Sequence, residues 1–315
     1  MRKNNKRAIE MGFNWIFAFI AGGFILLLAI YATSRLIGTQ EVVQGTEEAT
    51  KINSLLDPLE TGLASGESNQ INFQTVTRIY NEGCDSYSNS PFGKQEISIA
   101  EKTFSNKFGE KSDIVPIKNK YVFMEDVLEG KKMYIFSMPF FMPFKVSDLI
   151  IFVPEDYCFY DTPVEIVNDL ENLNIKNVHF PNSTEECKGK IVCFKDSEGC
   201  DIKVSMPDYY VQKDGKRLYF NKNLVYGAIF GSPQTYECNI KRLMSKLNEV
   251  GRVYVDKIEM IQRKACEPRI GDKLEILMSN AMALNASRQI VQLAELSDEI
   301  DSINEAAKPG CRLFS

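Results

Sequence analysis

The sequence predicts an α+β, or mixed α/β, protein that one N-terminal helix holds in a membrane. Three observations lead to this expectation. Residues Phe13 to Tyr31 carry no charged side chain, and about 20 apolar residues suffice for a helix to cross a bilayer. The middle of the chain reads as short strands around one helix. From Ser232 onward, apolar residues recur at helical spacing.

These patterns divide the chain into five segments. We expect a basic cytoplasmic tail (residues 1–11), a transmembrane helix (12–37) and a helical stalk that packs against the outer domain (38–66). A mixed α/β extracytoplasmic domain (67–231) and a C-terminal antiparallel helical hairpin (232–315) follow. Lipid offers the backbone no hydrogen-bond partner, so the apolar segment must be helical if it lies in a bilayer.

The charges around the apolar segment predict its orientation. Arg2, Lys3, Lys6 and Arg7 precede it, and basic residues stay on the cytoplasmic side of a membrane. We therefore expect a single-pass protein of the cell membrane with its N-terminus inside and its main domain outside. A cleaved secretory signal is the alternative, but signals have a shorter apolar core and an A-x-A-like cleavage site.

Small residues within the apolar segment suggest a contact in the membrane. Ala18 and Gly22 stand four residues apart, and such pairs let helices approach closely in lipid. The expected partners are the lipid bilayer and a protein, either a second copy or another chain, that packs on this helix. Gly and Ala are also common in membrane helices that have no partner.

The outer domain is expected to form a mixed sheet. Lys120 to Pro139 reads as a hairpin that turns at Glu129-Gly130-Lys131. A buried strand, a helix that opens at Thr162-Pro163, and a further strand make a parallel crossover. The two crossover strands are expected at 149–153 and 177–180, and the other strands at 71–76, 97–99, 191–194, 202–204, 217–220 and 224–230.

The cysteines predict disulfide bonds rather than a metal site. All eight follow the apolar segment and no C-x-x-C occurs, while His179 is the only histidine. An even number of cysteines outside the cell favours disulfides, whereas zinc sites use paired ligands. We expect no metal ligand and no cofactor. Asn182 and Asn285 each begin an N-x-[ST] sequence that could accept a glycan.

Two disulfide pairings are predicted, one from the expected helices and one from a turn. If residues 240–261 and 274–303 form an antiparallel hairpin, Cys238 and Cys311 return to one end, and Cys266 lies at the other end. We therefore expect a Cys238–Cys311 bond. Cys193 and Cys200 flank the turn at Ser197 and are the second predicted pair.

The search for catalytic chemistry identifies no catalytic residue. No nucleophile elbow, zinc-protease, P-loop or dinucleotide motif is present, and His179 lies within a short strand. Because the net charge is −5 and no basic patch follows the N-terminus, we expect no nucleic-acid partner. An anchored hydrolase that uses two carboxylates remains an alternative.

The segment from Met138 to Phe144 predicts a possible interface. It contains two prolines, and its other residues are aromatic or Met, which are types enriched at protein interfaces. Phe140, Phe141 and Phe144 are the candidate interface residues. An interface would expose Phe141 and Phe144, whereas a core loop would bury the aromatic residues.

The first residues resemble the N-terminus of type IV pilin-like proteins. The resemblance rests on Lys6-Arg7-Ala8-Ile9-Glu10-Met11 and the apolar helix up to Ile37. In that family a small residue precedes a cleavage point and a glutamate follows five places later; here Glu10 would stand second after Ala8. The anchor and residues 236–243 are also similar to segments of uncharacterised single-pass archaeal surface proteins, for which no activity is implied.

Together these patterns favour a membrane-anchored surface protein with a structural, assembly or partner-binding role. A pilin-like subunit of a surface filament and an anchored extracytoplasmic hydrolase are the alternatives.

Overall fold

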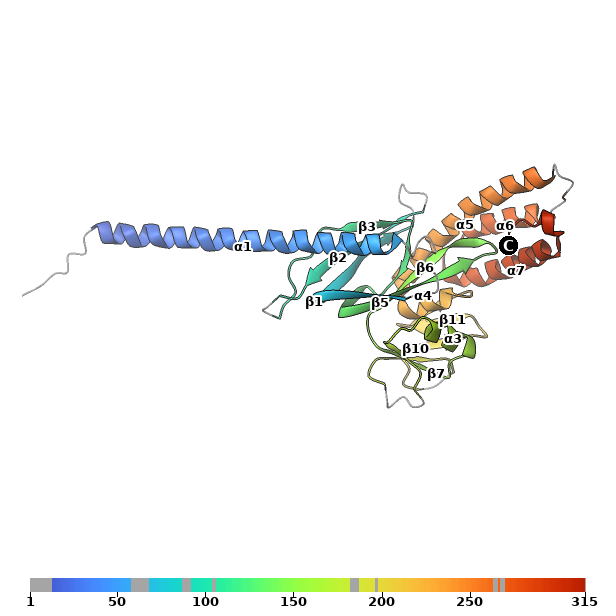
Figure 1. Cartoon of the computed structure of the whole chain (residues 1–315), viewed down its shortest axis with the longest axis horizontal. Coiled ribbons are helices and arrows are strands. Elements are labelled where there is room, and N and C mark those ends of the chain that lie inside the picture. Colours follow the sequence, from blue (N-terminus) through green and yellow to red (C-terminus); the bar gives the residue numbers. More distant parts are fainter. Residues whose placement is uncertain are drawn as a thin grey trace, which may run out of the picture.

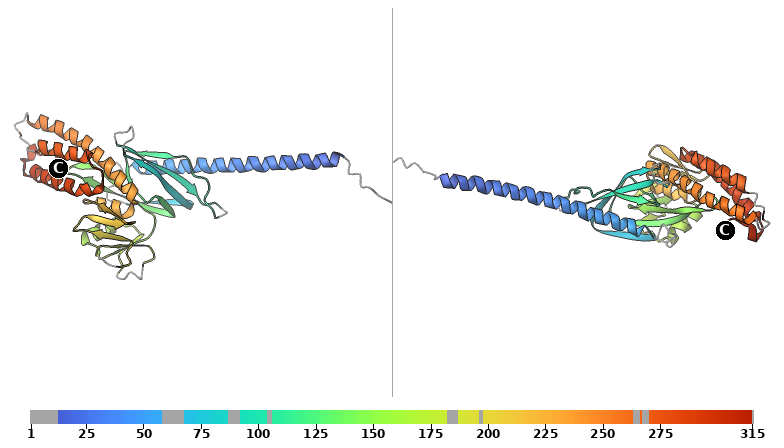
Figure 2. Two further views of the ribbon diagram at one scale, coloured as in Figure 1. Left: turned by 180° about the vertical axis from the view of Figure 1, so that it is seen from behind. Right: turned by 90° about the horizontal axis from the view of Figure 1, so that it is seen from above.

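The computed structural model describes residues 13–57, 68–86, 92–103, 106–181, 187–195, 198–262, 266 and 270–314. A long helix, α1 (Phe13–Leu55), projects from a body that contains two sheets and the C-terminal helices. Figure 2 shows the free part of α1 and the C-terminal helices at opposite ends of the molecule. The chain is therefore α+β, with an apolar N-terminal helix as expected. The predicted basic tail lies outside the described residues.

The second part of α1 packs on the body instead of standing free. Ala49, Ile52 and Leu56 are buried in one cluster with residues of the first sheet. A Cβ added to Gly45 would lie 2.9 Å from the Cβ of Ser112, so glycine permits this close approach. Within the helix predicted over residues 38–66, α1 continues to Leu55 and its last three turns contact the sheet, and residues 58–66 lie outside the described residues.

The first sheet has six strands in the order β3-β2-β1-β5-β6-β4. Neighbours pair antiparallel, except for the parallel pair β4 and β6. The strands are β1 (Ser68–Asp85), β2 (Lys94–Glu101), β3 (Val115–Lys118), β4 (Tyr121–Phe123), β5 (Val127–Phe141) and β6 (Lys145–Val153).

The predicted hairpin between Lys120 and Pro139 is wrong. Glu129, Gly130 and Lys131 lie inside β5, which continues without a turn. In the pairing of β1 with β5, the register jumps between Asn72 and Thr77, and Thr77 then faces Gly130. Gly130 therefore lies beside an irregularity in strand pairing, a common role of glycine in sheets, and not in a turn.

The second sheet also has six strands, in the order β12-β11-β10-β9-β7-β8. The four strands from β7 to β10 pair parallel, and β10 to β12 pair antiparallel. They are β7 (Tyr157–Tyr160), β8 (Val178–His179), β9 (Lys190–Cys193), β10 (Ile202–Ser205), β11 (Tyr210–Lys213) and β12 (Lys216–Tyr219). The crossover helix α3 (Val164–Asn172) connects β7 to the parallel β8.

Two predictions differ from the structure at the sheet–helix junctions. The first strand of the crossover is β7, because the apolar run Leu149 to Val153 belongs to β6 in the other sheet. Leu224–Phe230 is a helix, α4, rather than a strand. All seven α4 residues are buried. A short segment that is buried on every side shows no alternation of apolar and polar residues, so its sequence pattern cannot distinguish a helix from a strand.

The described residues of the C-terminal region form three helices rather than a hairpin. They are α5 (Pro233–Gln262), α6 (Gly271–Met282) and α7 (Ile290–Ala306), with the short turns η2 (Ser287–Gln289) and η3 (Pro309–Cys311). The expected second helix is interrupted between Ala283 and Gln289, where the chain turns back. The C-terminus consequently lies at the end of α5 that is far from its start (Figure 1).

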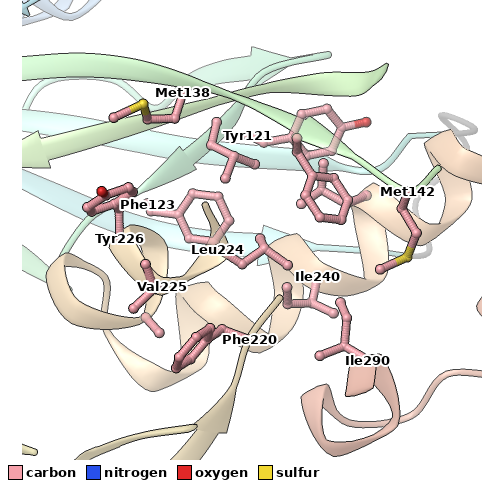
Figure 3. Close-up of a cluster of buried hydrophobic side chains, with 14 of the residues drawn as sticks. Tyr121, Phe123, Met138, Met142, Phe220, Leu224, Val225, Tyr226, Ile240 and Ile290 are labelled. Atoms are coloured by element: carbon pink, nitrogen blue, oxygen red, sulfur yellow. The ribbon is translucent and has the colours of Figure 1, made fainter. Parts of the chain in front are cut away.

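Strands β4 and β6 and the C-terminal part of β5 are buried on both faces of the first sheet. One face packs under α1, and the other packs against α4 and α5 in the main core. In β6, Leu149 and Ile151 enter the main core while Ile150 and Phe152 face α1. This explains the continuous apolar run, because alternate residues of a strand point to opposite faces. Figure 3 shows Tyr121 and Phe123 of β4 close to Leu224 of α4 and Ile240 of α5.

Candidate functional site

The apolar half of α1 is the first candidate site. The window Trp15–Leu36 has 22 residues, and none of it is buried against the rest of the described protein. Trp15, Phe19, Leu27 and many neighbours are at least half exposed. A contiguous apolar surface of this length marks a contact with lipid or with another chain, and the window is long enough to cross a bilayer.

Aromatic and basic side chains flank this window. Trp15 lies near its start, with its ring centroid 6.3 Å from that of Phe19. Near its end, the guanidinium of Arg35 lies 5.7 Å from the ring centroid of Tyr31. Twenty residues of helix span about 30 Å, which matches the hydrocarbon thickness. Trp and Tyr are enriched at the two membrane interfaces, so their positions suit a spanning helix.

Ala18 and Gly22, the predicted packing pair, lie on this free part of the helix. Ala18 is exposed, and a Cβ added to Gly22 would meet no described atom within 4 Å. A second helix therefore has room to approach them, and the pairing stays a prediction.

All eight cysteines form disulfides. The pairs are Cys84–Cys238, Cys158–Cys187, Cys193–Cys200 and Cys266–Cys311. The predicted Cys193–Cys200 bond is confirmed. Such bonds persist in oxidising compartments, which favours an extracytoplasmic location for the body.

The predicted Cys238–Cys311 bond is wrong. Cys238 lies at the start of α5 and bonds to Cys84 of β1, with 6.1 Å between their Cα atoms. Cys311 bonds to Cys266, just beyond the end of α5. The error comes from the missed turn between α6 and α7, because a third helix carries the chain back to the far end.

A buried ion cluster joins the two sheets. The carboxylate of Glu125, which follows β4, accepts hydrogen bonds from Lys213 of β11 (2.5 Å) and Lys190 of β9 (3.0 Å). Lys190 also lies 2.9 Å from Glu155. The side chain of Lys213 is only 4% exposed. Its ammonium also donates to the carbonyl oxygens of Ile229 (3.0 Å) and Gly231 (3.1 Å).

The cluster lowers the pKa of Glu125 and of Lys213 and raises that of the neighbouring Tyr157. Burial would raise the pKa of Glu125, but the charges of Lys213 and Lys190 outweigh it and lower that pKa. Burial lowers the pKa of Lys213 despite the neighbouring carboxylate of Glu125. Burial, with the charges of Glu125 and Glu155, also holds the pKa of Tyr157 well above its usual value.

The chemistry of the cluster is structural. The three acceptors around Lys213 suit the three N–H groups of its ammonium form, and a protonated nitrogen has no lone pair for nucleophilic attack. Perturbed pKa values often mark functional sites, but structural ion pairs perturb them too. The motif search could not find this cluster, since its residues lie on β9, β11 and the segment after β4.

A second buried cation, Arg242 of α5, holds α5 against the first sheet near the Cys84–Cys238 disulfide. Its guanidinium donates to the carbonyl oxygen of Phe92 (2.9 Å) and to Oδ1 of Asn239 (2.7 Å). Asn239 in turn donates to the carbonyl oxygen of Val122 in β4 (2.8 Å). Burial lowers the pKa of Arg242 to about 10. These contacts tie α5 to the first sheet, next to the Cys84–Cys238 bond.

Of the two alternatives for the Met138–Phe144 segment, burial favours the core loop over the interface. Phe140 and Phe144 are buried, and only Phe141 is exposed, at 37%. The ring of Phe144 stacks on Tyr254 of α5, with 4.5 Å between centroids. The aromatic residues therefore fill the core, and the Met142–Pro143 peptide is cis.

The structure does not bring the remaining predicted positions together into one site. His179 lies 3.4 Å from Asp156, and both side chains are about half exposed. Asn285 is exposed in the α6–α7 connection, whereas the hydroxyl of Ser287, in the same sequon, is buried and donates to Glu237 (2.5 Å). Asn182 lies outside the described residues.

Comparison with known proteins identifies no relative: no family model, no curated protein and no solved structure matches this chain.

Proposed function

We propose that the chain is a single-pass membrane-anchored protein whose disulfide-bonded body lies outside the cell and binds or assembles with partners there. The observation that carries the proposal is the free window Trp15–Leu36, continuous with the part of α1 that packs on the first sheet. Because the helix is unbroken, the body is held at a short and fixed distance from the bilayer. The basic N-terminus supports an inside orientation.

Topology labelling of the full-length chain tests this proposal. Epitope tags at the two termini are probed with antibodies on intact and on permeabilised cells. We expect the C-terminal tag to be accessible on intact cells and the N-terminal tag only after permeabilisation. The protein should also resist extraction from membranes by alkaline carbonate, and its intact mass should include residues 1–36. Extraction by carbonate, or a mass without these residues, would support a cleaved signal and refute the anchor.

A filament subunit is a second candidate, favoured by the continuity of α1. One helix of 43 residues runs from the apolar window into the body without a break, so copies could pack through their free halves while their bodies stay outside. Ala18 and Gly22 are the proposed contacts, since small residues let helices meet in lipid.

Electron microscopy of the detergent-extracted protein tests this second candidate. Filaments that disappear in Gly22→Leu but persist in the control Leu27→Phe, on another side of the helix, would support it. A monodisperse single chain at all concentrations would refute it.

A further inference from the structure

A groove lies where the second sheet meets the C-terminal helices. Its volume is about 850 Å³, within the range of ligand sites. The β10–β11 turn, β12, η2 and α7 form its walls. Three tyrosines are grouped there, Tyr209, Tyr210 and Tyr219, together with Arg217, Arg288 and Glu295. We call it the tyrosine groove.

Two of the tyrosines form a pair across neighbouring strands. Tyr210 of β11 stands opposite Tyr219 of β12, and their ring centroids are 5.9 Å apart. The guanidinium of Arg217 lies 4.7 Å from the ring centroid of Tyr210. Such cation–π and aromatic contacts each stabilise the arrangement, so both rings are held in place before any ligand binds.

The third tyrosine has a backbone conformation that its side chain does not favour. Tyr209 ends the four-residue turn between β10 and β11, with φ at +55°. A bulky residue there is an outlier, because Gly or Asn adopts this conformation with less strain. Tyr209 is nonetheless 48% exposed as a residue. Backbone strain clusters at ligand sites, and here it presents an aromatic ring to the groove.

A buried hydrogen-bond network joins the two walls. The backbone N–H of Tyr219 donates to Oγ of Ser287 (3.1 Å), and the hydroxyl of Tyr236 donates to the carbonyl oxygen of Tyr219 (2.6 Å). The hydroxyl of Ser287 donates to Glu237 of α5. Ser287 and Tyr236 are both almost fully buried. The network fixes β12 against η2, so the groove is rigid, and rigid sites lose less entropy on binding.

The charges of the groove point to a neutral ligand. Arg217 and Arg288 are balanced by Asp208 and Glu295. A phosphate-bearing or nucleic-acid ligand would require an excess of positive charge. Among the described residues, Arg288 and Glu295 have no ion-pair partner, so their forked polar groups are available to a ligand.

We propose that the tyrosine groove binds a neutral oligosaccharide. A sugar ring has a face of C–H groups, which packs on an aromatic ring, and an edge of adjacent hydroxyls, which suits the paired donors of Arg288 and the paired acceptors of Glu295. The inference rests on the proposed function in one respect: a body outside the cell meets surface polysaccharides. Proline-rich peptides also bind aromatic grooves, but charged and amide side chains dominate the lining here.

The test uses the full chain in lipid nanodiscs, since many mild detergents carry sugar headgroups. The nanodiscs are screened against neutral glucan, mannan and chitin oligosaccharides, with acidic oligosaccharides and proline-rich peptides beside them, and each hit is measured by calorimetry. Variants Tyr209→Asn and Arg288→Ala are compared with Tyr209→Phe and with Arg252→Ala, a matched exposed arginine on α5.

We expect at least one neutral oligosaccharide to bind. Its affinity should fall at least tenfold in Tyr209→Asn and in Arg288→Ala, and should stay within threefold of wild type in Tyr209→Phe and Arg252→Ala. Tyr209→Asn loses the edge contact of the ring with Phe220, 6.1 Å between centroids, but relieves the strained turn, so the melting temperature should change little. Absence of binding to every neutral oligosaccharide, preference for the acidic or peptide probes, or unchanged affinity in Tyr209→Asn would overturn the proposal.

Topology labelling on cells and oligosaccharide binding in nanodiscs together separate the two proposals. If the chain has its body outside the cell but binds no glycan, only the groove is refuted. If it binds glycans while its C-terminus is cytoplasmic, only the placement is refuted.

Discussion

Removing the charge of Glu125 should destabilise the body strongly. In Glu125→Gln, Lys213 keeps its two carbonyl acceptors but loses its carboxylate, and its side chain is only 4% exposed. Removal of one partner from a buried ion pair costs about 3–5 kcal/mol. The loss of stability has an upper limit, because the unpaired Lys213 can instead lose its proton. From the ordinary lysine pKa of 10.5, deprotonation at pH 7 costs about 5 kcal/mol.

The assay is pulse proteolysis of the full-length chain in urea, which reports the fraction unfolded. We expect a loss of about 3–5 kcal/mol in Glu125→Gln, and a recovery of at least about 2 kcal/mol when Lys213→Met is added, since no unpaired buried charge then remains. Glu155→Gln is the matched control. Glu155 also pairs with Lys190 but is 46% exposed, so its loss should stay below about 1 kcal/mol.

The same cluster predicts a pH dependence. The pKa of Glu125 is lower in the folded protein than its ordinary value of 4.5. Its contribution is therefore present above pH 4.5 and is lost as the pH falls through the folded pKa. Glu125→Gln should lack this acid-dependent loss. A loss below about 1 kcal/mol at pH 7 for Glu125→Gln, or a double variant no more stable than Glu125→Gln, would refute the reasoning.

Two further predictions concern other buried groups. The Tyr157 hydroxyl has no hydrogen-bond partner among the described residues, so Tyr157→Phe should leave stability at pH 7 unchanged or slightly higher. Because burial raises the Tyr157 pKa, wild type should lose about 1.4 kcal/mol per pH unit relative to this variant above pH 10, as measured by alkaline urea titrations. Replacing Cys84 and Cys238, 154 residues apart, should cost about 5 kcal/mol, and replacing Cys193 and Cys200, 7 apart, about 2 kcal/mol. Equal urea midpoints for the two cysteine variants would contradict the loop-entropy argument.

The elements that the sequence predicted correctly are those whose pattern lies within one short stretch of the chain. The apolar window of α1, the crossover helix α3 and the apolar strand β6 each follow from composition and periodicity within a short stretch. The Cys193–Cys200 pair was predictable because its two cysteines flank one turn. The turn between α6 and α7 was not, since apolar residues continue at helical spacing on both sides of it.

The tyrosine groove and the ion cluster required the tertiary structure. Tyr209 and Arg288, or Glu125 and Lys213, are far apart in the chain and carry no motif, and only the packing of β9 to β12 against the neighbouring elements brings them together. The sequence by itself determined that an uncharged helix precedes a disulfide-bonded body, because hydrophobicity and cysteine count are properties of composition. The structure alone decided how the other six cysteines pair and which polar groups meet, because these depend on distances between segments that no local pattern records.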